Sequence, residues 1–108
     1  MSLVAKGGAL IAAGRMSDKA ILVNETGDPF AFEVTVREAG SETRHRVTLG
    51  AADAARFAAE PKALVEAAFA FLLDREGKES ILARFDLGAI PRYFPEFAQE
   101  LPGYLARR

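Results

Sequence analysis

The fold is decided by residues 30–49, which read FAFEVTVREAGSETRHRVTL. Apolar and polar side chains alternate on both sides of the turn-forming residues 39–42. A period of two is typical of strands that bury one face and expose the other. Residues 30–49 are therefore predicted to form a β-hairpin.

The alternation also predicts how the two strands of this hairpin pair. Their apolar positions must share one face, so even positions of the first strand lie opposite odd positions of the second. We expect the turn to close at Gly40-Ser41, which places Arg37 opposite Arg44, a mildly unfavourable like-charge pair. The predicted pairs on the core face are Val36 with His45, Val34 with Val47, and Phe32 with Leu49.

Further elements are expected on both sides of the hairpin. Residues 20–24 are a possible third strand, because a short β-branched run there ends at a cluster of turn formers. A short helix is expected over residues 51–60. Residues 61–76 predict a helix that is apolar nearly all round, with Gly77 as its left-handed cap. Such a helix is central, with the sheet on one side and the C-terminal segment on the other.

The C-terminal segment predicts short helices separated by proline and glycine. Residues 79–85 and 89–94 form the first two, and residues 96–101 form the last before a break at Pro102-Gly103. The predicted fold class is therefore α+β, with a small antiparallel sheet packed on a central helix and short C-terminal helices around it.

Composition limits the chemistry of this 108-residue chain. Half of the residues are apolar, 27% are charged and the net charge is −1, so no global attraction to nucleic acid is expected. The chain has no cysteine. This excludes disulfides, thiolate zinc sites and a cysteine nucleophile, and it fits a reducing, cytoplasmic compartment. We expect neither a cofactor nor a metal.

The N-terminal residues stand apart from the rest. We treat residues 1–15 as an N-terminal extension or leader, and residues 16–108 as a single α+β domain. The apolar run over residues 7–14 is about as short as the core of a signal peptide can be. No stretch approaches the ~20 apolar residues of a membrane span. We therefore expect neither secretion nor a membrane partner, and we expect the tail to dock on its own sheet or on a second subunit.

Arginines form the main candidate contact surface. By alternation, Arg37, Arg44 and Arg46 lie on the outer face of the hairpin, and Arg92 is the main polar side chain of a loosely helix-turn-helix-like C-terminal segment. A basic ribbon can lie against phosphates, so nucleic-acid binding is one hypothesis. Glutamates interleave with the hairpin arginines and dilute their field, which favours a solvated strand face instead.

The other candidate residues have structural interpretations. His45 is the only histidine, and we expect it to be partly buried with one hydrogen bond rather than to act as a catalytic base. Asp74, Glu76 and Glu79 surround Gly77 and are interpreted as a solvated acidic turn. Five aromatic residues could line a pocket or an interface, with core packing as the default: Phe85, Tyr93, Phe94, Phe97 and Tyr104.

One pattern resembles known sequences. It consists of Pro61-x-x-Leu64-Val65, Phe69-x-Phe71-Leu72-Leu73-x-Arg75-Glu76, Glu79-Ser80-Ile81-Leu82-x-x-Phe85-x-Leu87 and Tyr93-Phe94-Pro95-Glu96-Phe97. Residues 61–97, which carry it, resemble short bacterial proteins without an assigned activity. The resemblance implies a bacterial cytosolic protein. Its motif consists of packing and capping residues, so it assigns no functional residue.

These observations favour a non-enzymatic protein-interaction module. A small sheet has open edges that invite pairing with another copy, and no proline lies within either hairpin strand to prevent it. We therefore expect self-association as a homodimer, or binding to another protein partner. Nucleic-acid binding through the basic hairpin face is the alternative, with contacts at Arg37, Arg44, Arg46 and Arg92.

Overall fold

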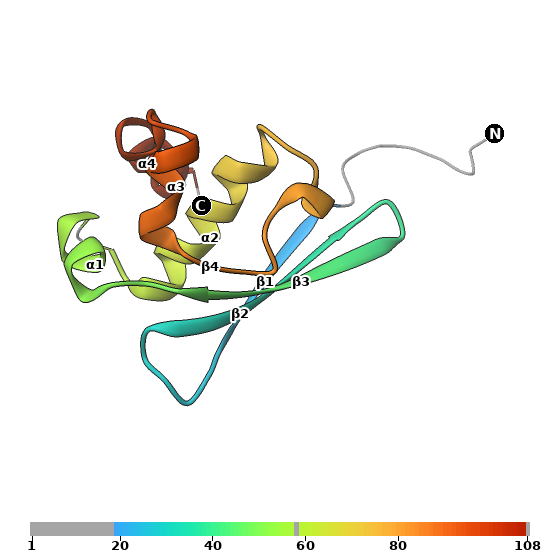
Figure 1. Cartoon of the computed structure of the whole chain (residues 1–108), viewed down its shortest axis with the longest axis horizontal. Helices are drawn as coiled ribbons and strands as arrows, with labels where there is room; N and C mark the ends of the chain where they lie inside the picture. The colour runs from blue at the N-terminus through green and yellow to red at the C-terminus, as the bar shows by residue number, and fades with distance from the viewer. Residues whose placement is uncertain (1–18, 58, 108) are drawn as a thin grey trace.

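The helices lie on one face of a four-stranded sheet (Figure 1). The computed structural model describes residues 19–57 and 59–107, so the predictions for residues 1–15 lie outside the described residues. The strands are β1 (Ala20–Glu25), β2 (Ala31–Glu38), β3 (Ser41–Thr48) and β4 (Arg84–Asp86). The helices are α1 (Ala51–Phe57), α2 (Pro61–Leu73), α3 (Ile90–Tyr93) and α4 (Phe97–Ala106), with the short 3-10 helices η3 (Lys78–Ser80) and η4 (Leu87–Ala89).

The chain has the predicted α+β fold, but its sheet is mixed rather than wholly antiparallel. The strand order is β1-β2-β3-β4, and β4 runs parallel to β3. The helix predicted over residues 79–85 is therefore wrong in its second half. The Arg46 amide donates to the Ala83 carbonyl at 2.7 Å, and the Thr48 hydroxyl donates to Asp86 Oδ1 at 2.7 Å. These partners are far apart in sequence, so local periodicity does not reveal the strand.

The hairpin prediction is correct for the faces of the strands but wrong for their register. The turn closes at Ala39-Gly40, whose φ angles of 56° and 80° suit a two-residue type I′ turn. This shift of two residues keeps every side chain on its predicted face. It also places Arg37 opposite Glu42 instead of Arg44, so an ion pair replaces a like-charge pair. The observed core-face pairs are Val36 with Thr43, Val34 with His45, and Phe32 with Val47.

Helix α2 is the centre of the core. Phe69 and Phe71 are both fully buried, although they lie on different sides of the helix. The ring centroid of Phe69 lies 5.4 Å from that of His45 on β3, and the centroid of Phe71 lies 5.0 Å from that of Phe97 on α4. The helix is therefore buried between the sheet and the C-terminal segment, as the sequence predicts (Figure 1).

The end of α2 differs from the prediction. The helix ends at Leu73, and Gly77 has a φ of −71°, so the predicted left-handed cap at Gly77 is wrong. The amides of Arg75 and Glu76 both donate to the Leu72 carbonyl, at 2.9 and 3.0 Å. These bonds close the helix with a tight right-handed turn that needs no glycine.

Helix α4 continues through Pro102-Gly103, where the sequence predicts a break. Phe97, Leu101 and Tyr104 are buried and follow the i, i+4, i+7 spacing of one helix face. Pro102 and Gly103 are exposed. An internal proline costs a helix about 3 kcal/mol, whereas burying each large apolar side chain contributes about 1.5–3 kcal/mol. Burial of the apolar face therefore outweighs the cost of the proline.

The conformation of the turn can be tested by substitution. Ala39 adopts a φ of 56°, a left-handed conformation that Asn and Gly tolerate and that costs most other residues about 1 kcal/mol. Ala39→Asn should therefore raise the free energy of unfolding by about 1 kcal/mol in urea denaturation. Ala39→Val should lower it, because a branched side chain suits this conformation least. Equal stability of all three proteins would contradict a left-handed residue at this position.

Candidate functional site

Three of the four arginines singled out from the sequence lie together on the outer face of the β2–β3 hairpin. Arg37 Nε donates to Glu42 Oε1 at 2.9 Å, and Arg44 Nη2 donates to Glu42 Oε2 at 3.0 Å. Arg46 Nη1 donates to Glu33 Oε2 at 3.2 Å. The hydrogen bonds from Arg37 and then Arg44 lower the pKa of Glu42 below its ordinary value. The face is therefore a network of ion pairs rather than a uniformly basic surface.

The fourth arginine lies away from this face. Arg92 is on α3, in the helical layer on the other side of the sheet (Figure 1). Arg84, which strand β4 places beside Arg46, is not among the arginines predicted from the sequence. Two residues further along β4, Asp86 adds a carboxylate to the same face as Arg84. Only the pairing of β4 with β3 reveals this arrangement.

His45 is a packing residue of the sheet. It is 5% exposed, and its Nδ1 donates to the Leu82 carbonyl at 2.8 Å. A carbonyl can only accept, so Nδ1 carries the hydrogen, and Nε2 bonds to the Thr43 hydroxyl at 2.9 Å. With both ring nitrogens engaged, His45 fixes the segment between η3 and β4 against β3.

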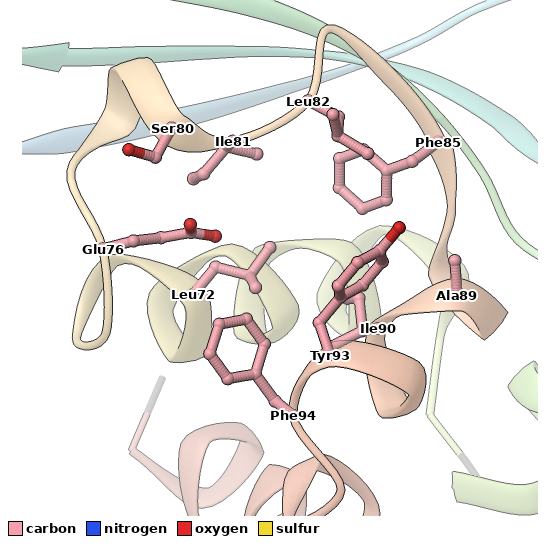
Figure 2. Close-up of a pocket in the computed structure, with 10 residues that line it drawn as sticks. All are labelled: Leu72, Glu76, Ser80, Ile81, Leu82, Phe85, Ala89, Ile90, Tyr93 and Phe94. Atoms are coloured by element: carbon pink, nitrogen blue, oxygen red, sulfur yellow. The ribbon is translucent and has the colours of Figure 1, made fainter.

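An apolar pocket of about 220 Å³ opens between the end of α2, the segment from η3 to β4, and α3 (Figure 2). Its walls come from successive elements within residues 72–94, which the fold brings around one space. Local periodicity does not reveal the pocket, because the pairing of β4 with the distant strand β3 sets how these elements face one another. The apolar side chains that form its walls are those of Leu72, Ile81, Phe85, Ile90 and Phe94.

The five aromatic residues singled out from the sequence divide between this pocket and the core. Phe85, Tyr93 and Phe94 line the pocket. Phe97 and Tyr104 pack edge-on against a phenylalanine of α2, with centroid distances of 5.0 and 5.7 Å. The pocket hypothesis and the packing hypothesis therefore each describe part of the group.

Polar groups enter this pocket at few points. The Glu76 carboxylate is the one charged group among the lining side chains, and it points into the pocket from the end of α2 (Figure 2). Within residues 19–57 and 59–107, no basic side chain bonds to it. Ser80 and Tyr93 supply hydroxyl groups. At the mouth, Leu82 is 55% exposed and Tyr93 is 68% exposed, so two large apolar surfaces face solvent beside the opening.

The three acids around the end of α2 do not form one cluster. Asp74 accepts a hydrogen bond from the Tyr104 hydroxyl, and Glu79 accepts one from Lys78 Nζ at 2.6 Å. Glu76 turns toward the pocket instead (Figure 2). The interpretation of these residues as a solvated acidic turn is therefore wrong for Glu76.

Arg75 ties the end of α2, where Glu76 lies, to the C-terminal segment. Its guanidinium carbon lies 3.7 Å from the centroid of the Phe71 ring, a cation–π contact. Its Nε donates to Glu96 at 3.0 Å, and its Nη2 donates to Glu100 at 2.7 Å. Burial acts to lower the pKa of Arg75, but the hydrogen bonds outweigh it and hold that pKa above its ordinary value. The part of the pocket that carries Glu76 is therefore firmly anchored.

Strand β1 forms an open edge of the sheet. Among residues 19–57 and 59–107 it pairs with β2 alone. The Leu49 amide donates to the Phe30 carbonyl at 2.9 Å, so even-numbered residues of β2 bond to β3 and odd-numbered ones bond to β1. On β1 the even-numbered residues therefore bond to β2. The backbone groups of Ile21, Val23 and Glu25 point away from the sheet.

The side chains of this edge add an apolar and a charged component. Leu22 is 40% exposed and lies on the outer face of the sheet. Lys19 precedes the strand and Glu25 ends it, so the two ends of the edge carry opposite charges. Proline, which would interrupt a new ladder of hydrogen bonds, is absent from β1.

The described part of the chain has no metal-binding cluster and no membrane-length helix. Among residues 19–57 and 59–107, His, Asp and Glu side chains nowhere gather in groups of three or more that could hold a metal ion. In the same residues, every helix is too short or too polar to cross a bilayer.

Comparison with known proteins assigns no family to the chain. No protein-family model matches it. No curated protein and no solved structure matches it either. The resemblance of residues 61–97 to short bacterial proteins, and the bacterial origin it implies, therefore stay predictions. The function has to be argued from the geometry of the described residues.

The contacts of Glu96 predict a loss of stability in acid. Its pKa lies below the ordinary value of 4.5, first because its own backbone amide bonds to the carboxylate and then because Arg75 does. The folded state therefore binds this proton less readily than the unfolded chain. The stabilising effect is complete above about pH 4.5 and is lost as the pH falls through the lower, folded-state value.

Thermal unfolding followed across this range of pH measures the effect. The midpoint of wild type should fall as the solution is acidified, and Glu96→Gln should reduce the size of that fall. Glu60→Gln, at an exposed position before α2, serves as the control, because it removes one carboxylate without removing a contact to Arg75. Superimposable pH profiles for wild type and Glu96→Gln would contradict the lowered pKa of Glu96 as the cause of the fall.

Proposed function

We propose that this protein is a non-enzymatic protein-interaction module that self-associates through the open edge of β1. The observation that carries the proposal is the set of outward-facing backbone groups of Ile21, Val23 and Glu25. Each unpaired amide and carbonyl can bond to a strand added at this edge. A second copy of the chain offers the same groups in the same spacing.

A two-fold axis beside Leu22 would satisfy both copies at once. Antiparallel strands centred there place the outward-facing residues of one copy opposite those of the other, as hydrogen-bonded pairs require. The pairs are Lys19 with the partner's Glu25, Ala20 with the partner's Asn24, Ile21 with the partner's Val23, and Leu22 with the partner's Leu22.

The side chains are complementary in this register. Leu22 meets its own copy at a closely spaced pair, which removes from water an apolar side chain that is 40% exposed in one chain alone. Lys19 meets the partner's Glu25, so opposite charges face each other at both ends of the new ladder. Lys19 lies 3.9 Å from Glu38 in its own chain and would bridge both carboxylates.

The non-enzymatic part of the proposal is supported by the state of His45. A general base must reach the proton it removes. His45 is buried and has both ring nitrogens in hydrogen bonds to its own chain, so it serves packing instead. We also assign the protein to the cytoplasm, because a chain without cysteine suits a reducing compartment.

Nucleic-acid binding through the hairpin face has weaker support. A phosphate would have to displace Glu42 from Arg37 and Arg44, and Glu33 from Arg46. The counterion release that drives such binding follows the number of phosphates that basic side chains neutralise, and these arginines are already engaged by carboxylates. The interleaved carboxylates therefore favour the protein-interaction proposal over this alternative.

Disulfide trapping tests the proposed edge and its register together. The chain has no cysteine, so Leu22→Cys introduces a single thiol. In the proposed dimer the two thiols lie directly opposite each other, within the Cα separation that a disulfide spans. Mild oxidation should therefore convert this variant to a covalent dimer of twice the 11.6 kDa chain mass on a non-reducing gel.

Asn24→Cys is the matched control, because Asn24 is exposed on the same face of the same strand. In the proposed register, Asn24 and the partner's Asn24 are offset by four residues along the strands. Their Cα atoms are then about 13 Å apart, which a disulfide cannot span. It should stay monomeric on the gel. Equal trapping of both variants would reject the register. A wild-type mass that stays at one chain in light scattering as concentration rises would reject self-association.

A further inference from the structure

The pocket of Figure 2 is not explained by the proposed dimer, because it borders β4, at the opposite edge of the sheet from β1. We propose that this pocket receives a single basic side chain, Lys or Arg, presented by an apolar segment of a partner protein. The proposal does not depend on the dimer, so the two can fail separately.

The size of the pocket points to one side chain. Sites for drug-sized molecules measure about 300–1,000 Å³, whereas this pocket measures about 220 Å³. Its walls are apolar, with Leu72, Ile81 and Ile90 among them. Such walls suit the long aliphatic stem of lysine or arginine, which packs on apolar surface while its charged head reaches a polar partner.

The charge of the pocket points to a cation. Glu76 directs its carboxylate inward, and no basic side chain of the described residues neutralises it there. A carboxylate beside apolar walls gains from a charge-assisted hydrogen bond more than a fully solvated one does. The rings of Phe85, Tyr93 and Phe94 line the same space and offer faces for a cation–π contact.

The rim of the pocket favours a protein partner over a small amine. Leu82 and Tyr93, which are 55% and 68% exposed, flank the opening. A small cation inside the pocket would leave both side chains in water. Apolar residues next to an inserted basic side chain would cover them, in the usual arrangement of an anchored side chain surrounded by apolar contacts.

The pocket is formed before any partner binds. On one side the bonds from His45 to the Leu82 carbonyl and from Arg46 to the Ala83 carbonyl, at 2.8 and 2.7 Å, fix the segment that carries the rim. On the other side the Arg75 contacts fix the end of α2. A preformed site loses less conformational entropy on binding.

Peptide titration followed by NMR of the full chain tests the proposal. The probe is the blocked pentapeptide acetyl-Ala-Leu-Arg-Leu-Ala-amide, compared with the same peptide carrying citrulline, the neutral isostere of arginine. The arginine peptide should shift the amide signals of residues 76, 80–82 and 93–94. The citrulline peptide should bind at least about tenfold more weakly, because it lacks the charge that Glu76 recognises.

Two variants and one small cation complete the test. Glu76→Gln should bind the arginine and citrulline peptides equally, whereas Glu60→Gln, at the other end of α2, should keep the wild-type preference. An NMR spectrum of Glu76→Gln that is unchanged away from the pocket would show that this variant remains folded. No saturable binding of the arginine peptide, or an undiminished arginine preference in Glu76→Gln, would overturn the proposal. So would phenethylamine binding as tightly as the peptide, since the rim contacts would then contribute nothing.

Discussion

The burial of α2 on both of its sides is the constraint on which the rest of the structure depends. With Phe69 on one side and Phe71 on the other, the helix needs two apolar layers, and the sheet provides only one. The C-terminal helices provide the second layer. Arg75 covers the end of α2 by lying over the Phe71 ring. Because α2 occupies the inner face of the sheet, a partner of the sheet contacts its edges or its outer face.

The two proposed contact surfaces lie at opposite edges of the sheet. Strand β1 forms one edge, and β4, which borders the pocket, forms the other. A dimer joined through β1 would therefore have one continuous sheet, made of the four strands of each copy, with a pocket beside each of its two outer edges. Two weak sites held on one rigid body bind a bivalent partner more tightly than either site alone, without any new contact. Self-association and peptide recognition would then reinforce each other.

Prediction from the sequence succeeded where a local period decides the structure. Alternation over residues 30–49 predicted which side chains face the core, and the broad apolar character of residues 61–76 predicted a helix buried on two sides. The strand register was wrong by two residues, because a shift of two leaves the alternation unchanged. The turn decides the register, and Ala39 in a left-handed conformation is not the residue that turn propensity indicates.

The sequence by itself determined the α+β class, the inward faces of the hairpin and the central place of α2, because these follow from spacings within one segment. Only the tertiary structure decided strand β4, the course of α4 through Pro102 and the pocket around Glu76. Each of these depends on contacts between segments far apart in the chain, such as the bond between Arg46 and Ala83. The free energy of such contacts overrides local preference, so a proline can lie inside a helix and a turn glutamate can face an apolar pocket.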